Sequence, residues 1–304
     1  MMEIMGSRHL IFGAGGFLGR HLMAVLKRSG VGNYLGTGVV HLPAEHGCRF
    51  DLLHDSIADL PPEYRSVPDG SGFAVICSAI SRIDQCRSNP ASRLLNVEKT
   101  VELSCRLADA GYQVCFISSD QVFDGKRGGY TETDAVNPVN AYGQQKAETE
   151  TLLQQKIPER LLIARLSKQV CSFRDPANVF TQWEQTAQEG RQIRHIDGME
   201  LSFTDAADTA KVLLELAARR VCGIFHVCGK EHFTRDRLCR EYLTLSSLNA
   251  ETVNIPLEEF HFQDNRPLKT WLNSNKLTAI MPIGFTPMKE LIKLYIKTTE
   301  ETGS

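Results

Sequence analysis

The sequence lacks the features that mark several classes of protein. Its 304 residues include 34 basic and 36 acidic side chains, so it has no basic excess of the kind that binds nucleic-acid phosphates. No run of about 18 uninterrupted apolar residues predicts a membrane span. No basic segment followed by an apolar one predicts export at the N-terminus. We therefore expect a cytoplasmic protein that binds neither nucleic acid nor membranes.

Motifs of hydrolases, nucleoside triphosphatases and zinc proteins are absent as well. The sequence contains no G-x-S-x-G elbow, no P-loop and no C-x-x-C pair. Its nine cysteines are irregularly spaced, and several lie in apolar runs, which is typical of reduced, buried thiols. His41, His46, Cys48 and His54 lie close together, but their spacing fits no compact ligand pair, so we predict no metal site.

What the sequence does contain is an alternation of strand and helix patterns. Short apolar runs, typical of buried parallel strands, alternate with segments that repeat apolar residues at helical spacing. The expected strands are residues 8–12, 34–40, 73–77, 113–118 and 160–166, and the expected helices are residues 16–28, 93–110 and 142–156. This alternation predicts an α/β fold built on a Rossmann-like, doubly wound parallel sheet.

The alternation loosens after residue 167, which indicates a second, smaller domain. Further helices are expected near 178–189 and 205–219, and a late strand at 224–228. We predict a cofactor-binding domain of residues 1–165 that also takes in about 196–222. The predicted substrate-binding domain is discontinuous and consists of residues 166–195 and 223–304.

Four glycines follow the first expected strand and open the first helix, and three of them, Gly13, Gly16 and Gly19, are spaced three residues apart. Glycine allows a tight turn and lets the backbone approach a pyrophosphate closely. The helix N-terminus then offers unpaired N–H groups to the phosphates. This setting predicts a dinucleotide cofactor. The predicted contacts in this segment are Gly13, Gly16, Phe17, Leu18, Gly19 and Arg20.

Tyr142 and Lys146 lie four residues apart at the start of an expected helix, so both side chains face the same site. An unperturbed tyrosine titrates near ~10, which makes it a poor acid or base at neutral pH. We expect the Lys146 ammonium to stabilise the phenolate and to lower the pKa of Tyr142. Lys146 is also suited to hold a nicotinamide ribose by hydrogen bonds.

Several segments together resemble a known family. The G-x-x-G-x-x-G spacing at 13–19 and the Y-x-x-x-K spacing at 142–146 resemble the extended short-chain dehydrogenase/reductase superfamily. Residues 117–148, with S-S-D-x-V-F-D-G and N-P-x-N-x-Y-G-x-x-K, closely resemble dTDP-4-dehydrorhamnose reductases. Further similar segments are 202–210, 222–229 and 266–277, so the resemblance extends from about residue 7 to residue 293.

The resemblance implies a catalytic set of Ser119, Tyr142 and Lys146. Ser119 would hydrogen-bond the reacting carbonyl group, and Tyr142 would give the proton while the nicotinamide supplies the hydride. Related dehydratases carry Asp-Glu directly after the catalytic hydroxyl, whereas this sequence has Asp120-Gln121. A neutral amide cannot act as the second acid, which argues against dehydration. Asp120 and Gln121 are predicted substrate contacts.

The resemblance also implies cofactor contacts outside the glycine turn. Asp51 and Leu52 match the pair that contacts adenine in the family. Ser78 and Ala79 follow the expected strand at 73–77, where the family packs near the nicotinamide ribose. Asn96 matches a family asparagine expected near the active site, with an ordinary polar helix residue as the alternative.

The choice between NAD and NADP depends on the end of the second strand. NAD-preferring relatives carry an acid there, which accepts hydrogen bonds from the ribose hydroxyls. Here Gly38 stands at that position, and no acid occurs between residues 5 and 41. Arg20 and His41 would not repel a 2′-phosphate, although both could equally be solvated surface residues. This pattern favours NADP(H) over NAD(H).

Substrate contacts are expected from the C-terminal half. Asn178 and Arg266 lie in segments where the relatives bind a nucleotide diphosphate, and an arginine fork suits that group. For each residue the alternative is a structural salt bridge or a capping interaction. Homodimers are common among the relatives, and one is compatible with this sequence.

We hypothesise from these features an NADP(H)-preferring reductase that acts on a keto group of a nucleotide-activated sugar. Its setting would be the synthesis of deoxysugars or of polysaccharide precursors. Two alternatives stay open. The first is an NAD-dependent nucleotide-sugar epimerase with the same catalytic residues. The second is a non-catalytic NADP-binding regulatory subunit on the same fold.

Overall fold

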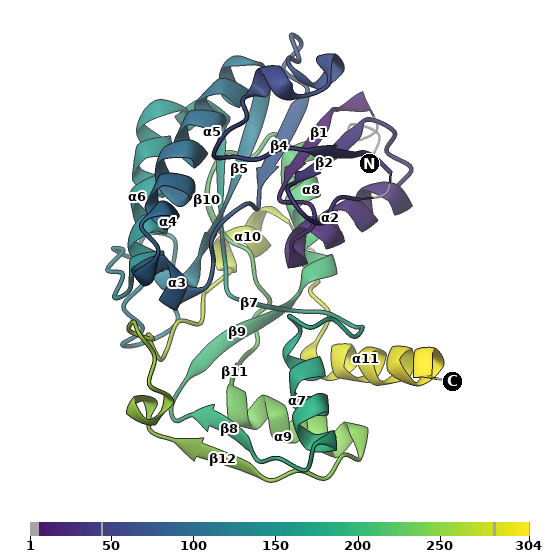
Figure 1. The fold of residues 1–304 in the computed structure, drawn as a ribbon, viewed down its shortest axis with the longest axis vertical. Helices are drawn as coiled ribbons and strands as arrows, with labels where there is room; N and C mark the ends of the chain where they lie inside the picture. Colours follow the sequence, from purple (N-terminus) through teal and green to yellow (C-terminus); the bar gives the residue numbers. More distant parts are fainter. Residues whose placement is uncertain (1–5, 44, 282–283, 304) are drawn as a thin grey trace.

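The computed structural model describes residues 6–43, 45–281 and 284–303 (Figure 1). The larger lobe is a seven-stranded parallel sheet in the order β10-β6-β5-β4-β1-β2-β3. Its strands are β1 (His9–Phe12), β2 (Tyr34–Gly38), β3 (Gly47–Arg49), β4 (Gly72–Ile76), β5 (Tyr112–Ser119), β6 (Leu161–Leu166) and β10 (Gly223–His226). The predicted doubly wound sheet is confirmed. The strand order reverses between β1 and β4, which is where open α/β sheets bind ligands.

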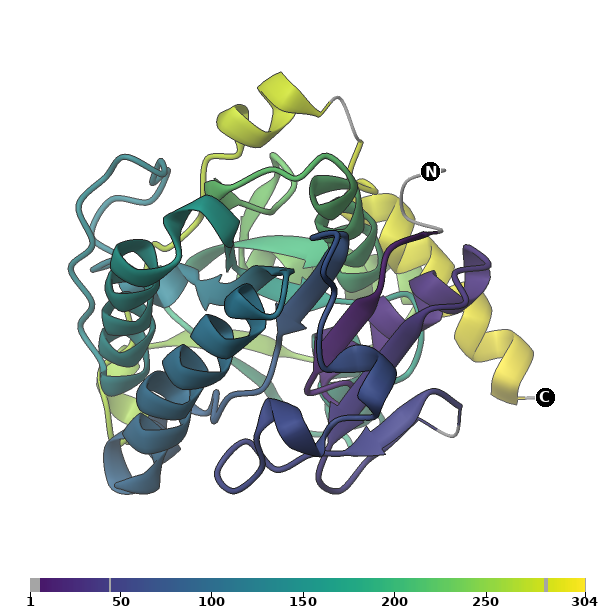
Figure 2. The same cartoon turned by 90° about the horizontal axis from the view of Figure 1, so that it is seen from above.

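Helices cover both faces of this sheet, as the view from above shows (Figure 2), and alternating side chains of the strands pack against them. Ile11 of β1 packs under α2 (Phe17–Arg28) and α8 (Ala206–Ala218), in one hydrophobic cluster. Leu10 and Phe12 pack on the opposite face with α5 (Thr100–Asp109). That face also carries α4 (Ala91–Arg93), the π-helical stretch η3 (Leu94–Lys99) and α6 (Ala141–Lys156).

The strand β10 belongs to the larger lobe, which corrects the predicted domain boundary. We expected residues 223–304 to lie together in the substrate domain. Instead, β10 pairs in parallel with β6, and α10 (Asn275–Ile280) packs against it. A short apolar run predicts a strand, but it does not indicate which other strand lies beside it in the sheet. The partner of β10 is β6, more than 50 residues earlier in the sequence.

The smaller lobe is built from short strands around an aromatic core. A three-stranded sheet joins β7 (Lys168–Val170), β9 (Glu200–Asp205) and β11 (His232–Thr234), and a two-stranded one joins β8 (Ile193–Ile196) and β12 (Thr252–Ile255). The helices are α7 (Val179–Gln188), α9 (Arg235–Ser246) and α11 (Met288–Gly303). Trp183 is 3% exposed in this core, among Phe180 and Tyr242.

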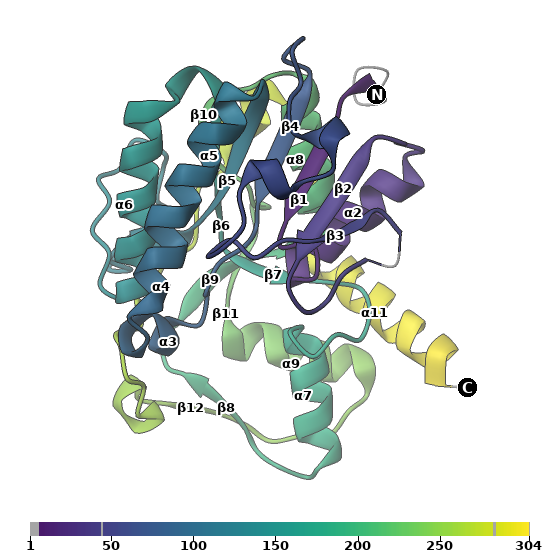
Figure 3. The same cartoon turned by 45° about the horizontal axis from the view of Figure 1, so that its top comes forward.

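The two lobes meet below the carboxyl ends of the central strands, where β7 and β9 cross under the sheet (Figure 3). The short helix α3 (Ile83–Ser88) lies at the same edge. Single 3₁₀ turns occur at Ile57–Asp59, Pro62–Tyr64, Asp120–Val122, Pro158–Arg160 and Leu257–Phe260. Within the described part of the chain no helix is long and apolar enough to cross a membrane. All nine cysteines carry free thiols.

Candidate active site

A cavity of about 520 Å³ lies between the two lobes. Its walls come from the start of α2, the ends of β5 and β6, the start of α6 and the strand β7. The predicted residues that line it are Gly16, Phe17, Leu18, Gly19, Ala79, Ser119, Asp120, Gln121, Tyr142 and Lys146. The structure thus brings the three predicted catalytic residues into one cavity with the glycine turn.

A second cavity of about 340 Å³ continues from the first at the glycine turn. The two cavities share Gly16 and Ala79 as lining residues. Gly13, Asp51, Leu52 and Ser78, all predicted cofactor contacts, line the second cavity. Together the cavities form an elongated space that runs from the ends of β2 and β3 to the catalytic residues. An extended dinucleotide fits such a shape.

The glycines of the turn serve two different purposes. Gly16 has an extended backbone, with φ −72° and ψ 169°, and an added Cβ would meet only the Gly13 carbonyl oxygen, at 3.2 Å. A Cβ on Gly19 would overlap that same oxygen and the backbone of Ala14. Gly19 is therefore required for packing the helix on the turn. Gly16 leaves a free cradle beside the first N–H groups of α2, which suits a pyrophosphate.

Three secondary structures position the catalytic residues. Ser119 ends β5, where its hydroxyl oxygen accepts a hydrogen bond from the Gln121 N–H at 3.2 Å and so starts the following 3₁₀ turn. Tyr142 lies in the first turn of α6, and Lys146 follows one turn later. The Lys146 ammonium donates to the Ile117 carbonyl at 2.7 Å and lies 5.7 Å from the centre of the Tyr142 ring. The strand end and the helix thus converge on one wall.

The electrostatics of Tyr142 differ from the sequence-based expectation. We expected Lys146 to lower the pKa of Tyr142. Burial, and after it the Asp120 carboxylate, instead raise the pKa of Tyr142 well above its ordinary value, and a hydrogen bond with Ser119 only partly opposes this. Burial also lowers the pKa of Lys146 to about 8. Spacing along a helix predicted proximity correctly, but it did not include desolvation, which dominates here.

Asp120 lines the cavity with its carboxylate already surrounded by donors. It accepts hydrogen bonds from the Thr270, Ser167 and Ser119 hydroxyls at 2.7, 2.8 and 3.0 Å, and from the Gln121 amide at 3.4 Å. Burial raises the pKa of Asp120 despite these bonds. Asp120, a predicted substrate contact, is therefore also a carboxylate that links the two lobes through its hydrogen bonds with Ser119 and Thr270.

Asn96 lines neither cavity and lies behind residues 78–80, which line the second one. Its amide nitrogen donates to the Ile80 carbonyl at 2.9 Å and to Gln145 Oε1 at 2.7 Å, while its Oδ1 accepts from the Ile80 N–H at 2.9 Å. Asn96 belongs to the π-helical stretch η3, a feature common at functional sites. It fixes the loop that carries Ser78 and Ala79, so its effect on a cofactor is indirect.

Arg20 lines neither of the two cavities. Its guanidinium binds the Asp175 carboxylate and donates to the Gly15 carbonyl at 2.5 Å. Gly38 and His41, by contrast, line the second cavity. The sequence placed Arg20 near the turn, but the direction of its side chain is decided by Asp175 from the smaller lobe.

Asn178 has a capping role in the structure and does not reach the cavity. The side chain is fully buried, and its Oδ1 accepts from the Phe180 N–H at the start of α7. Its amide nitrogen donates to the Cys171 and Phe173 carbonyls at 2.8 and 3.1 Å. This corrects the expected diphosphate contact. Nothing in the linear sequence separates a capping asparagine from a ligand-binding one.

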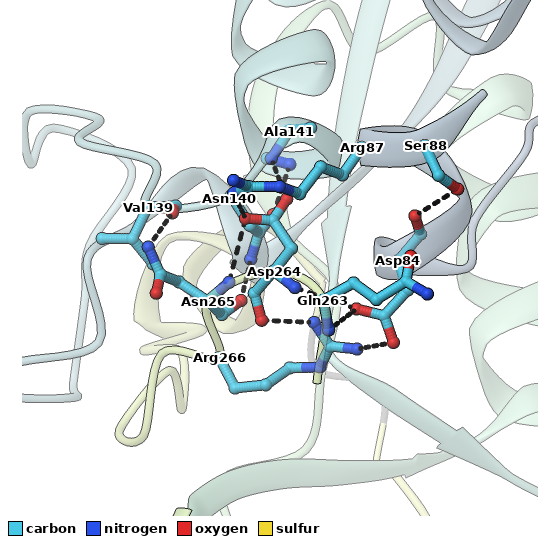
Figure 4. Close-up of polar contacts among 11 residues, drawn as sticks. Asp84, Arg87, Ser88, Val139, Asn140, Ala141, Gln263, Asp264, Asn265 and Arg266 are labelled. Atoms are coloured by element: carbon cyan, nitrogen blue, oxygen red, sulfur yellow. Dashed lines mark hydrogen bonds and ion pairs between the residues drawn. The ribbon is translucent and has the colours of Figure 1, made fainter. Parts of the chain in front are cut away.

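Arg266 also has a structural role, in a polar cluster between the lobes (Figure 4). Its guanidinium forms an ion pair with Asp84 of α3 at 2.9 Å and donates to the Asp264 carbonyl at 3.0 Å. The Asp264 carboxylate accepts from the Ala141 N–H at 2.9 Å, at the first residue of α6. The segment that we expected to bind a diphosphate therefore holds the start of the helix that carries Tyr142.

Sequence reasoning missed part of the cavity wall. Ser167, Lys168 and Gln169, which follow β6 and begin the smaller lobe, all line the main cavity. They lie in a polar stretch without periodicity, so no pattern identified them. Among the described residues, no three His, Cys, Asp or Glu side chains are grouped to hold a metal ion.

Comparisons with known proteins agree with this architecture. A family profile described as "RmlD substrate binding domain" matches residues 7–301. Methionine adenosyltransferase 2 subunit beta of Xenopus tropicalis is 31% identical over 289 residues, covering 92% of this chain and 84% of that protein. The dTDP-4-dehydrorhamnose reductase of Aggregatibacter actinomycetemcomitans is 27% identical over 260 residues, covering 83% of each.

A solved structure gives the same fold. The dTDP-4-dehydrorhamnose reductase of Bacillus anthracis, crystallised in complex with NADP, superposes with a TM-score of 0.78 at 19% identity. The match covers 95% of this chain and 98% of that one. At this level of identity the likeness establishes the fold alone.

Proposed function

Because this chain belongs to the family of the RmlD substrate binding domain, we propose that it is an NAD(P)H-dependent reductase of a nucleotide-activated keto-sugar. The observation that carries the proposal is the convergence of Ser119, Tyr142 and Lys146 on one wall of the main cavity, which continues into the cradle at Gly16. The similarity to a dTDP-4-dehydrorhamnose reductase supports the same substrate class.

The residues of the wall divide the chemistry between them. Bound NADPH would supply the hydride to the carbonyl carbon. Ser119 would donate a hydrogen bond to the carbonyl oxygen, and Tyr142 would transfer its phenolic proton to that oxygen as negative charge develops. Burial and Asp120 raise the pKa of Tyr142, so the phenol stays protonated at neutral pH and gives up its proton only to a stronger base, the alkoxide that forms as the hydride reaches the carbonyl carbon. Lys146, held by the Ile117 carbonyl, is placed to steady the ribose and the phenolate that forms.

The cofactor that we propose is NADP(H) in preference to NAD(H). Gly38 and His41 line the second cavity. Asp51, an acid, also lines it, at the position that the family resemblance assigns to adenine binding. An acid at the end of β2 would repel a 2′-phosphate, and Gly38 stands there instead. The NADP complex of the Bacillus anthracis reductase and the NAD complex of MoeE5 support a nicotinamide dinucleotide as the cofactor, while the choice of NADP(H) rests on Gly38. Titration with NADPH and NADH, with a dissociation constant at least tenfold lower for NADPH, is the expected result.

The replacement Tyr142→Phe tests the proposed reaction. We expect kcat with a panel of nucleotide 4-keto-sugars to fall at least ~100-fold, because the proton donor is lost. The NADPH dissociation constant should change less than about twofold, since the ring is kept. Tyr34→Phe, which alters a buried ring outside the main cavity, is the matched control. Normal turnover by Tyr142→Phe would refute the assignment of the proton donor.

A second candidate function comes from the similarity to methionine adenosyltransferase 2 subunit beta. By its name, that relative is a subunit of methionine adenosyltransferase 2. The alternative to a reductase is therefore a cofactor-binding subunit that catalyses no reaction of its own. Saturable NADPH binding without turnover on the whole panel, together with complex formation with a methionine adenosyltransferase in sedimentation velocity, would favour the subunit. Turnover that depends on Tyr142 would favour the reductase.

A further inference from the structure

Two cations of the smaller lobe have no partner within the described chain. Lys168 begins β7 and lines the main cavity, and Arg235 begins α9. Neither side chain forms a hydrogen bond, an ion pair or a ring contact with any described residue. Both are only partly exposed. Their charges lie close enough to disfavour each other, since Arg235 is the main charge that lowers the pKa of Lys168.

The acids around this pair already have partners. Asp120, the carboxylate that faces Lys168, accepts hydrogen bonds from four neighbouring groups and lies outside ion-pair distance of the lysine. Asp236, next to Arg235 in sequence, binds Arg240 at 3.0 Å. Glu200 binds His232 at 2.7 Å. Among the described residues, therefore, no acid forms an ion pair with Lys168 or Arg235, and the Asp120 charge acts on Lys168 only from beyond ion-pair distance.

An unpaired, desolvated cation costs stability, so its presence calls for a compensating role. Burial and Arg235 lower the pKa of Lys168 to about 8, which leaves most of the side chain charged at neutral pH. The adjacent Gln169 has a buried Oε1 that also lacks a hydrogen-bond donor within the described residues. Consecutive residues of the cavity wall thus present unsatisfied polar groups, as a wall does when its partner is a ligand.

We propose that Lys168, with Arg235 adding positive potential near it, binds an anionic oxygen group of the substrate in the main cavity. This inference rests on the proposed nucleotide-sugar substrate. Lys168 follows Ser167, which donates to Asp120, and Asp120 accepts from Ser119, so the anion lies near the reacting end of the substrate. Two groups of such a substrate carry anionic oxygens there: a carboxylate on the sugar, and the diphosphate attached to it.

The experiment measures ligand binding by Lys168→Gln, with Lys293→Gln on the exposed surface of α11 as the matched control. UDP-glucose, UDP-glucuronic acid, dTDP-glucose and NADPH are titrated calorimetrically at low and high salt. We expect Lys168→Gln to weaken a nucleotide sugar at least tenfold and NADPH less than twofold. If UDP-glucuronic acid alone is weakened, the anion is the carboxylate. If all three nucleotide sugars are weakened equally, it is the diphosphate.

Other outcomes would overturn the proposal. Equal affinities of Lys168→Gln and the wild-type chain for every nucleotide sugar would refute Lys168 as the contact while leaving the reductase proposal intact. Loss of NADPH affinity in Lys168→Gln would assign the lysine to the cofactor. Failure of the wild-type chain to bind any nucleotide sugar would refute the substrate class itself. Because the substitution removes a partly exposed charge that has no ion-pair partner among the described residues, we expect the melting temperature of Lys168→Gln to be equal to or above that of the wild-type chain, so that weakened binding is not a folding defect.

Discussion

The two lobes treat buried charge in opposite ways. In the larger lobe, Arg165 and Glu150 form a doubly hydrogen-bonded ion pair, with both side chains 3% exposed. Lys146 in the same lobe is tied to the Ile117 carbonyl. In the smaller lobe, Lys168 and Arg235 have no counterion among the residues that the structure describes. The difference separates charges that belong to the fold from charges that await a ligand.

This comparison has a physical basis. A buried ion pair has its attraction to offset desolvation, and breaking it leaves an uncompensated charge. A partly buried cation without a counterion has lost part of its hydration energy with no ion pair to offset that loss. Replacing such a cation by a neutral side chain therefore does not lower the stability of the fold. Under the proposed function, the larger lobe holds groups that every reaction cycle reuses, and the smaller lobe leaves the charge of Lys168 open for a group that arrives and departs.

The largest expected effect comes from breaking the ion pair of the larger lobe. Glu150→Gln keeps the shape of the side chain but leaves the Arg165 charge buried without a counterion. We expect it to lower the free energy of unfolding by about 3–5 kcal/mol. Urea denaturation followed by circular dichroism measures this, with Lys168→Gln as the paired variant. Similar losses in the two variants would contradict the comparison between the lobes.

The next largest effect concerns the pH dependence of the free energy of unfolding, which should differ between the wild-type chain and Lys168→Gln. The pKa of Lys168 is about 8 in the folded chain, below its ordinary value of 10.5. Between these values the unfolded chain binds a proton that the folded chain does not, so the free energy of unfolding rises with pH. Below pH 8 Lys168→Gln should be more stable than the wild-type chain by about 2 kcal/mol, and this advantage should vanish towards pH 10.5. Thermal melts across this range measure it, and a constant difference would show that Lys168 is not desolvated.

The smallest expected effect concerns the glycine turn. Gly16→Ala should weaken NADPH binding about tenfold, or ~1.4 kcal/mol, because the new methyl group occupies the pyrophosphate cradle. Its melting temperature should fall only slightly, since a Cβ there meets one atom, the Gly13 carbonyl oxygen at 3.2 Å, which must move by a few tenths of an ångström. Gly19→Ala is the contrasting control and should lower stability by about 1–3 kcal/mol through overlap with the Gly13 carbonyl. Unchanged NADPH affinity in Gly16→Ala would place the cofactor elsewhere.

Much of the larger lobe was predictable because its signals are local. The apolar run of β5 and the helical spacing from Tyr142 to Lys146 identified the strand and the helix that carry the catalytic residues. The carboxyl ends of parallel strands lie at one edge of the sheet, so the topology also predicted that Ser119 and Tyr142 lie close together. The pKa of Tyr142 was not predictable in this way, because it depends on burial and on Asp120, and burial exists only in the folded chain.

The smaller lobe was far less predictable, and the reason is visible at particular residues. Asn178 and Arg266 have side chains suited equally to a diphosphate and to the fold. The structure gives them a helix cap and an ion pair with Asp84. Lys168 gave no signal, because its role depends on which acids lie nearby and whether they are already bound. The strand β10 was found, but its place beside β6 was not.

The sequence by itself determined the alternation of strands and helices, the glycine turn and the spacing of Tyr142 and Lys146 on one helix, because each is encoded by residues close together in the chain. Only the tertiary structure decided which polar side chains are satisfied. A hydrogen bond such as Asp264 to Ala141, or the missing counterion of Lys168, depends on segments that lie far apart in sequence. Satisfaction of buried charge is a property of the whole packed chain, and in this protein it separates structural residues from those that meet a ligand.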